Sequence, residues 1–370
     1  MVRCGRALLR LGVWNFDSAL NRYSLILLPS RGSRLSEGGP MAHPPSIKDV
    51  AREAGVSPTL ASFALNGREG VGEKTRQRIL AVAAELGYRG NPYARALRTG
   101  SSNSFGLLIR NLGNPIFLDV IAGAQEAAIE SETTVLVADS DYSFDRERQH
   151  IERFAANRVD GLAIAPVGPG ESVELWHELR PGAPTVVLYA TAQGLDNVIR
   201  VGPDARRAVR LAVEHLVEYG HRDIAFLTAP PELMADHDRL AELEVVCAEL
   251  GITPRPVATL LNLTAVTERT TKLLSGPGAP TAVITNSDYT AHGVYLAARE
   301  CGLVIGRDLS VVGHDDLPTA ALLDPPLTTI TMDGRALGRA LVARLRQSDQ
   351  TDHAESVGLV VRRSTGPAPS

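Results

Sequence analysis

The sequence has few of the residues that build disulfide frameworks or metal sites. Its 370 residues include three cysteines, Cys4, Cys247 and Cys301, which are far apart and odd in number. No Cys-x-x-Cys or Cys/His spacing occurs. We therefore expect neither zinc nor a disulfide framework, and the reducing cytoplasm is the natural compartment.

Long apolar runs are also missing. The run Leu25–Leu28 is too short to cross a bilayer, and no small-residue cleavage site follows an apolar segment of signal-peptide length. The sequence therefore predicts a protein with no membrane partner.

Signatures of the common enzyme chemistries are absent as well. No G-x-G-x-x-G follows the first predicted strand, and no Ser/His/Asp or nucleophile-elbow pattern stands out. Gly67–Thr75 approaches a P-loop, but Glu73 separates the second glycine from Lys74 and the segment follows a helix. His314–Asp316 carries metal-binding residue types, yet neighbours at a strand exit diverge. We expect no enzyme, no metal and no cofactor.

What the sequence does contain is a pair of short helices with strong local signals. Ser46 is a good N-cap, and Asp49 completes a capping box with it. Gly55 suits a tight turn, after which Ser57 caps a second helix that opens on Pro58. An αα-hairpin without a DNA role would show the same signals, so this pair alone does not decide the function.

Two further segments extend the pattern. A third helix is predicted over residues 73–86, ending before Gly87. Asn91 and Pro92 then open a one-turn helix that ends at Leu97, too short to be stable alone. Residues 41–100 carry nine basic and five acidic residues, whereas the 370-residue chain has a net charge of −4. Positive charge at this end favours a phosphate-binding surface.

These motifs and several later ones resemble the LacI/GalR family of bacterial transcription regulators over residues 45–365. The early matches are A-G-V-S, L-N-G, E-x-T-R, L-G-Y and N-P-x-A-R-x-L-R-T-G; the later ones are R-V-D-G-L (158–162), Y-G-H-R-D-I-A-F (219–226), P-T-A-V-I-T-N-S-D (280–288), L-S-V-V-G-H-D-D (309–316) and D-P-P-L-T-T-I (324–330). The resemblance implies a repressor that binds a pseudo-palindromic double-stranded DNA operator as a homodimer. It also implies control by a small-molecule effector, most often a sugar or related metabolite.

The resemblance and the motif chemistry together give the expected DNA-binding residues. They are Ser46, Ser57, Pro58, Thr59, Ser62, Phe63, Asn66 and Tyr88 in the helices, and Asn91, Ala94 and Leu97 in the hinge. By resemblance, two Leu97 side chains of a dimer wedge open one minor-groove step. Phe63 stands where the family usually has an arginine that reads guanine, so the operator sequence cannot be carried over.

From residue 104 onward, short apolar runs alternate with helical patterns. Strands are predicted at Phe105–Ile109, Thr134–Ala138, Gly161–Ala165, Thr185–Tyr189, Ile224–Leu227, Val257–Leu260, Ala282–Thr285 and Ser310–Gly313, with helices such as Pro115–Glu130 and Asp145–Ala156 between them. This alternation favours α/β lobes built on parallel sheets, and the resemblance implies a two-lobed, periplasmic-binding-protein-like core.

The expected domains follow from these patterns. They are an extension over 1–40, an all-α helix-turn-helix domain over 45–90, a hinge and linker over 91–103, and a core over 104–365 for effector binding and dimerisation. Within the core, lobe 1 is expected at 104–190 and 331–348, and lobe 2 at 193–329 and 356–363. We interpret 1–40 either as a disordered extension or as a mis-assigned start, with translation beginning at Met41. The rival interpretation is a basic arm that adds nonspecific DNA affinity.

Ligands of open parallel sheets bind at the carboxyl ends of strands. The expected effector-binding residues there are Asn114, Phe117, Asp139, Arg239, Asn286, Asp288 and Asp315, of which Arg239 matches the family's ligand-clamping arginine. Carboxylates and amides can bind sugar hydroxyls, and an aromatic face suits a sugar ring. Tyr189, Ala190 and Glu242 depart from the family pattern, so the effector's identity is not carried over.

Two other function classes share such a core. A solute receptor feeding a transporter is disfavoured by the helix-turn-helix and by the missing signal peptide. An α/β enzyme is disfavoured by the missing catalytic motifs. The sequence thus favours a ligand-responsive DNA-binding regulator.

Overall fold

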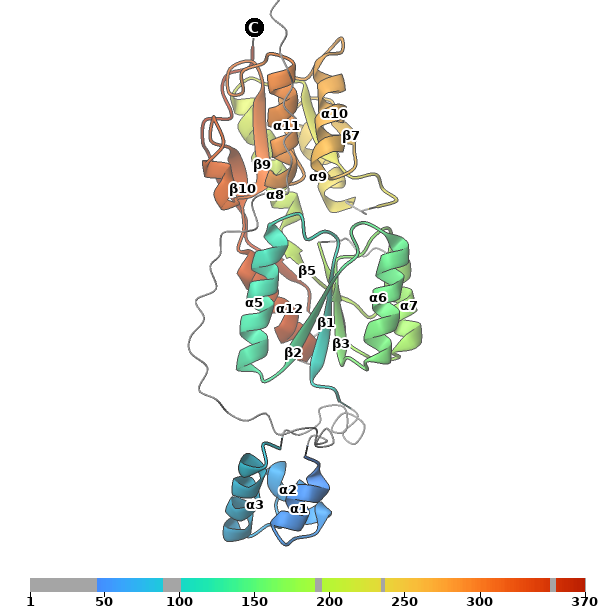
Figure 1. Ribbon diagram of the computed structural model, residues 1–370. Coiled ribbons are helices and arrows are strands. Elements are labelled where there is room, and N and C mark those ends of the chain that lie inside the picture. Colours follow the sequence, from blue (N-terminus) through green and yellow to red (C-terminus); the bar gives the residue numbers. More distant parts are fainter. Residues whose placement is uncertain (1–44, 89–100, 190–194, 234–236, 347–350, 370) are drawn as a thin grey trace, which may run out of the picture. The chain divides into compact units, whose positions relative to one another are not determined.

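A computed structural model describes residues 45–88, 101–189, 195–233, 237–346 and 351–369 of the chain (Figure 1). The chain divides into two units at residue 89, a helical head and an α/β core, and each is described by itself. The extension predicted over 1–40 and the hinge residues Asn91, Ala94 and Leu97 lie outside the described residues.

The head is a three-helix unit. Its helices are α1 (Ile47–Glu53), α2 (Pro58–Leu65) and α3 (Glu73–Glu85). The predicted capping box of Ser46 and Asp49 is present, Gly55 turns the chain at φ +63°, and Ser57 accepts from the Leu60 N–H. The small apolar core consists of Val50, Ala51, Ala54, Ala61, Ala64, Ile79 and Ala83. Local capping and a shared apolar interior therefore define this unit, as the sequence predicts.

The core begins with a lobe built on a six-stranded sheet in the order β11-β5-β4-β3-β1-β2. Its strands are β1 (Ser104–Ile109), β2 (Thr134–Asp139), β3 (Gly161–Ile164), β4 (Thr185–Leu188), β5 (Ile199–Pro203) and β11 (His353–Glu355), and its helices are α5 (Ile116–Glu130), α6 (Phe144–Ala156), α7 (Glu171–Leu179) and α12 (Gly334–Arg346). Figure 1 shows α5 and α12 on one face of this sheet and α6 and α7 on the other.

Close packing joins α5 to α12 although more than two hundred residues separate them. A Cβ at Gly123 would overlap the Arg335 carbonyl, and a Cβ at Gly338 would overlap the Val120 carbonyl. Only glycine allows the two backbones to approach this far. The C-terminal helix α12 thus packs into the first lobe.

The second lobe is built on another six-stranded sheet, in the order β12-β10-β9-β8-β6-β7. Its strands are β6 (Ile224–Thr228), β7 (Arg255–Ala258), β8 (Ala282–Ile284), β9 (Ser310–Asp315), β10 (Thr328–Thr331) and β12 (Gly358–Val360), and its helices are α8 (Ala205–Glu218), α9 (His237–Glu249), α10 (Leu263–Leu274), α11 (Asp288–Glu300) and the short 3₁₀ helix η2 (Pro318–Ala321). All strand pairs in both sheets are parallel except β10 with β12. The predicted fold class, a helix-turn-helix head followed by a two-lobed α/β core, is confirmed.

Strand pairing shifts two expected boundaries. β5 pairs with β4 in the first sheet, so a second lobe beginning at residue 193 is wrong for this strand. β11 also joins the first sheet through β5, whereas the sequence predicts no strand there. The three-dimensional fold decides which strands form hydrogen bonds with β5. The apolar pattern of β5 alone does not identify those strands. The predicted strand Val257–Leu260 begins two residues earlier, at Arg255.

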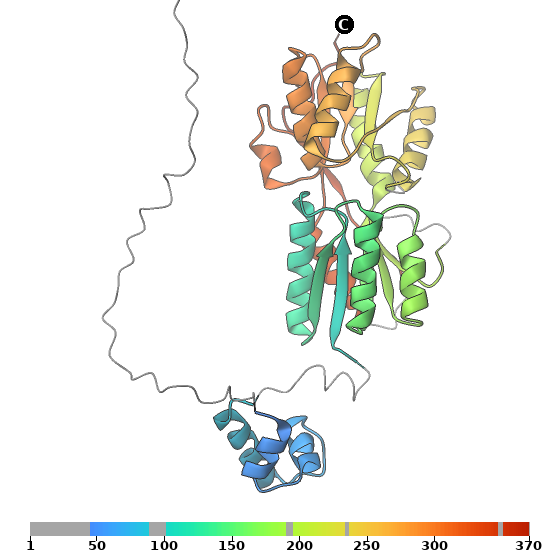
Figure 2. The ribbon, with the colours of Figure 1, turned by 45° about the vertical axis from the view of Figure 1, so that its right-hand side comes forward.

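The described backbone passes between the lobes three times, after β5, after β10 and after β11. The connections lie near Pro203–Ala205, Thr331–Gly334 and Glu355–Gly358. Figure 2 shows the two lobes of the core end to end, joined at these segments. Among the described helices, none is both long and apolar enough to cross a membrane.

Candidate functional site

The start of α2 presents the side chains expected to face DNA. Ser57, Pro58 and Thr59 are exposed, whereas Ser62 and Phe63 are half-buried one turn later. The Arg68 guanidinium lies 5.7 Å from the centre of the Phe63 ring, a cation–π distance. α2 therefore carries hydroxyl groups at its start and, one turn later, an aromatic ring with a cation over it.

The other predicted residues of the head have structural contacts. The Asn66 side-chain amide donates to the Ser62 carbonyl at 2.6 Å, and Tyr88 packs against the head's apolar core. Hydrogen bonds from Ser46 hold the pKa of Asp49 at about 2. Sequence reasoning missed Arg76, whose guanidinium donates to the Ala64 carbonyl at 3.1 Å and to the Arg68 carbonyl at 2.6 Å. Arg76 therefore ties α3 to the end of α2 and to the loop after it.

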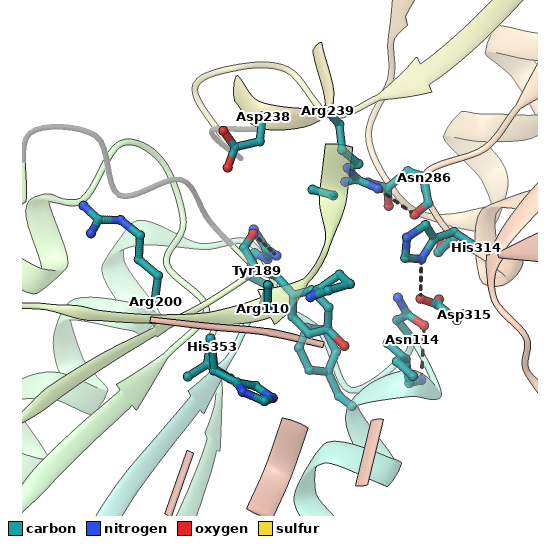
Figure 3. A pocket seen from close by; sticks show the side chains of 18 of the residues that line it. Arg110, Asn114, Tyr189, Arg200, Asp238, Arg239, Asn286, His314, Asp315 and His353 are labelled. Carbon is teal, nitrogen blue, oxygen red and sulfur yellow. Dashed lines mark hydrogen bonds and ion pairs between the residues drawn. The ribbon is translucent and has the colours of Figure 1, made fainter. Parts of the chain in front are cut away.

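In the core, a cavity of about 270 Å³ lies between the two lobes (Figure 3). Five of the predicted effector residues line it, namely Asn114, Phe117, Arg239, Asn286 and Asp315. They come from the segments that follow β1 and β8, from α9 and from the end of β9. Strand ends from both lobes thus meet at one site, as parallel sheets favour.

The wall from the first lobe is aromatic and cationic. The Phe117 and Tyr189 rings pack edge to face, with centroids 5.8 Å apart. The Arg110 guanidinium donates to the Tyr189 carbonyl at 3.4 Å, and Arg110 is only 4% exposed. Burial raises the pKa of the Tyr142 and Tyr189 phenols further above neutral, so both can donate hydrogen bonds. This wall can therefore pack against a ring and donate hydrogen bonds.

The wall from the second lobe is built on one arginine and a histidine–aspartate pair. The Arg239 guanidinium donates to the Asn286 carbonyl at 3.2 Å. His314 Nδ1 lies 3.1 Å from Asp315 Oδ1, and burial raises the pKa of Asp315. Within the described part of the chain, His314 Nε2 and Asp315 Oδ2 are buried without a hydrogen-bond partner. Buried polar atoms of this kind are satisfied when a ligand supplies the missing bonds.

The backbone at this wall is strained. Asp315 has φ +115° and Asp316 has φ +53°, values that residues with a side chain rarely adopt. Such strain persists only where the surrounding structure enforces it, and it gathers at ligand sites. This backbone conformation sets the direction in which the chain leaves β9 at Asp315.

Two predicted effector residues do not line the cavity. Asp288 is fully buried: its Oδ1 accepts from the Thr329 hydroxyl at 2.6 Å, and its Oδ2 accepts from the Leu317 N–H at 2.8 Å. Gly313 leaves the space for this carboxyl, since a Cβ there would overlap it. Asp139 ends β2, and its carboxylate accepts from the Asp141 N–H at 3.0 Å. Neither residue lines the cavity and both side chains bond to protein groups, so direct contact with an effector stays a prediction for these two residues.

Other cavity residues escaped the sequence interpretation. They are chiefly Arg110, Tyr142, Arg200, Asp238, His314 and His353. Arg200 pairs with Asp352, its guanidinium 3.6 Å from the carboxylate, while the Arg200 N–H donates to the same group at 2.8 Å. The pairing of β5 with β11 creates this contact, so no local pattern could reveal it. A cation directly after the first buried strand is the one signal that could have marked Arg110.

Behind the first wall lies a buried carboxyl group. Glu147 on α6 has no exposed surface, and its carboxylate accepts from the Val167 N–H at 2.9 Å. Burial raises the pKa of Glu147 to about 7, although the Arg110 charge acts in the opposite direction. Among the described residues, no cluster of histidine, cysteine and acidic side chains fits a metal ion.

Comparison with known proteins identifies both units. Residues 46–91 match the model of bacterial regulatory proteins of the lacI family, and residues 213–365 match that of the periplasmic binding protein-like domain. The chain is 30% identical to the HTH-type transcriptional repressor PurR of Proteus mirabilis over 88% of this chain and 98% of that protein. It is 29% identical to the ribose operon repressor of Haemophilus influenzae, covering 82% of this chain and 91% of that protein.

A solved structure agrees with these relatives. The lac repressor dimer bound to operator and the anti-inducer ONPF is 29% identical to the chain, with a TM-score of 0.76, covering 88% of this chain and 100% of that one. Head and core thus occur together in proteins that are similar along most of their length. The chain belongs to the LacI family of bacterial transcription regulators.

Proposed function

We propose that the protein is a repressor whose affinity for a pseudo-palindromic DNA operator is set by a small molecule bound between the lobes of its core. One observation carries the proposal: the core attached to a helix-turn-helix head contains a cavity lined from both lobes. The protein acts in the cytoplasm as a homodimer, as the operator-bound lac repressor dimer suggests. We assign the head to residues 45–90, the hinge to 91–103 and the core to 104–365.

The exposed start of α2 supports major-groove recognition. In helix-turn-helix proteins the first residues of the second helix contact base edges. Thr59 and Phe63 stand one turn apart there, and Thr59 is exposed. We assign base reading to these two residues, with Phe63 contacting a thymine methyl group. Ser57 and Pro58 fix the helix start, and Leu97 of the hinge is assigned to the minor groove by family resemblance.

The cavity supports a compact, hydroxyl-rich effector. Its volume of about 270 Å³ is near the lower end of the usual ~300–1,000 Å³ for ligand pockets. Asp315 and Asn286 can bind hydroxyl groups from the second lobe, and Phe117 offers an apolar face from the first. The relatives include a ribose operon repressor. We therefore propose a sugar or related single-ring metabolite.

A ligand that contacts both lobes stabilises one lobe arrangement over others. In a dimer this arrangement sets the separation of the two DNA heads, so effector and operator affinities are coupled and the coupling is reciprocal. Function then needs binding and no bond-making step. We accordingly assign no catalytic activity to the core, in line with relatives that are DNA-binding regulators.

The test is a binding-site selection on fragments of the source genome with the full-length protein, followed by a screen of metabolites for release or tightening of the selected complex. The proposal requires a two-fold symmetric site and at least one metabolite that shifts the apparent Kd. Failure to select any DNA sequence above background would refute it.

A further inference from the structure

One motif of the sequence, R-V-D-G-L (158–162), has no part in the cavity. Its Asp160 lies in the loop between α6 and β3, and the parallel pairing of β1 with β3 places it at the end of the sheet away from the cavity. The carboxylate accepts from the Ser102 N–H at 2.9 Å and from the Asn103 N–H at 2.7 Å. It also accepts from the Ser101 hydroxyl at 2.7 Å and from the Ser102 hydroxyl at 3.3 Å. One half-buried side chain thus holds three consecutive residues.

Neighbouring segments fix this arrangement from both sides of β1. The Asp160 N–H donates to the Ser104 carbonyl at 2.7 Å, which ties the loop before β3 to the start of β1. On the β2 side, the Thr134 N–H donates to the Asn103 carbonyl at 3.0 Å, and the Asn103 side-chain amide donates to the Glu132 carbonyl. Asn103 has φ +53°, a left-handed conformation that asparagine adopts more readily than most residues. Several contacts therefore set the direction in which the chain enters β1.

The residues held by Asp160 end the segment that we assign to the linker. Only Arg98, Thr99 and Gly100 separate Ser101 from Leu97, the residue assigned to the minor groove. Even fully extended, this stretch spans at most about 14 Å. A loosely attached linker would let Leu97 sample many positions, and that freedom is lost when the operator is bound. Holding residues 101–103 shortens the free segment and keeps Leu97 near a fixed point of the first lobe.

We propose that Asp160 is a positioning residue for operator binding: its carboxylate fixes the point and the direction from which the linker leaves the first lobe. In a homodimer, two such points set the separation at which the two hinges meet one operator. A change in lobe arrangement moves both points and reaches the DNA-binding segments through Asp160. This inference rests on the proposed function, since it names a residue that connects the core to operator binding.

The test uses the full-length protein, the operator obtained by binding-site selection, and two altered operators with one or two base pairs inserted at its centre. Half-site spacing is a geometric property of such complexes, so the wild type should prefer the selected spacing. Asp160→Ala should bind the selected operator about tenfold more weakly, the usual effect of ordering one more residue. Its preference for the selected spacing should fall by at least about threefold, because a longer free linker can span all three operators.

The ratio of affinities separates this role from a structural one. A substitution that only unfolds part of the protein lowers the active fraction, which weakens binding to all operators equally and leaves the ratio unchanged. Asp160→Asn keeps one acceptor oxygen and should lie between Asp160→Ala and the wild type. Ser101→Ala removes one of the hydroxyl donors and should cause a smaller loss of discrimination. Asp145→Asn, at an exposed position on α6 of the same lobe, is the matched control and should change nothing.

Two results would overturn this inference alone. They are a spacing preference of Asp160→Ala equal to that of the wild type, and equal binding of the wild type to all three operators. In both cases the selection of an operator still supports the proposed function. Failure to select any DNA sequence would refute the proposed function and this inference with it.

Discussion

The Thr329 hydroxyl donates a 2.6 Å hydrogen bond to the carboxyl group of Asp288, joining the start of α11 to β10 inside the second lobe. The pair is completely buried, and burial, together with the neighbouring Asp315 carboxyl, raises the pKa of Asp288. Both effects favour the neutral acid over the carboxylate. The carboxyl group acts as part of the protein interior, and its environment differs from that of Asp315 on the cavity side.

Substitution of Asp288 should accordingly affect stability first. Asp288→Ala leaves the Leu317 N–H and the Thr329 hydroxyl without this partner and should lower the free energy of unfolding by about 2–4 kcal/mol. Asp288→Asn resembles the protonated acid and should cost less than about 1.5 kcal/mol at pH 7. Urea unfolding measures both, with exposed Asp145→Asn as the control. Equal, small losses in all three would contradict this assignment.

A second prediction concerns the response to the effector. Arg239→Ala should leave operator affinity intact and weaken effector binding by about 2–5 kcal/mol, because it removes a charge that the cavity shields. Operator titrations with and without the effector measure the change. Arg207→Ala, an exposed arginine on α8 of the same lobe, should respond like the wild type. An Arg239→Ala protein that responds at wild-type effector concentrations would remove this residue from the site.

The third prediction concerns base reading by α2. Phe63→Arg should change the preferred half-site by roughly 1–3 kcal/mol at one base pair, since arginine can donate two hydrogen bonds to guanine and phenylalanine none. Parallel binding-site selections with the two proteins reveal the change. Arg68 needs its own control, Arg68→Gln, because its guanidinium lies over the same ring. Identical base preferences for wild type and Phe63→Arg would show that Phe63 does not face the bases.

The fourth prediction concerns pH. The pKa of Glu147 is raised by burial from 4.5 to about 7. Between these values the folded protein holds a proton that the unfolded chain has released, so the free energy of unfolding falls as pH rises, by up to about 3 kcal/mol. Glu147→Gln keeps an acceptor for the Val167 N–H and should flatten this slope. Unfolding curves from pH 4.5 to 8 decide it, and an unchanged slope would show that another group titrates.

How far the sequence alone reached differs between the two units. The head is determined locally: Ser46, Gly55 and Ser57 begin and end its helices by contacts within four residues. In the core, strands such as β1, β3 and β6 were predictable because fully buried parallel strands are continuous apolar runs. The membership of β5 in the first sheet was not, because it depends on partners chosen in three dimensions.

The site shows the same limit. The strand-end rule correctly gathers Asn114, Asn286 and Asp315 around one cavity. It does not bring Asp288 there, since an acidic residue at a helix start can face either the cavity or the interior, and the space at Gly313 draws it inward. The sequence analysis missed Arg110 because the functional importance of a cation depends on whether its side chain is buried. The neighbouring residues in the sequence do not reveal that burial.

The threefold passage of the chain between the lobes also affects biosynthesis. When the ribosome has released only the residues up to β10, the first lobe still lacks α12, and Gly123 on α5 has no backbone to contact. The second lobe still lacks β12 and the Ser364 hydroxyl that accepts from the Thr328 N–H. Neither lobe can complete its native packing until the last residues emerge. A nascent chain stalled near residue 330 therefore exposes unfinished surfaces on both lobes at once, making premature termination a greater aggregation hazard than in proteins whose domains are continuous in sequence.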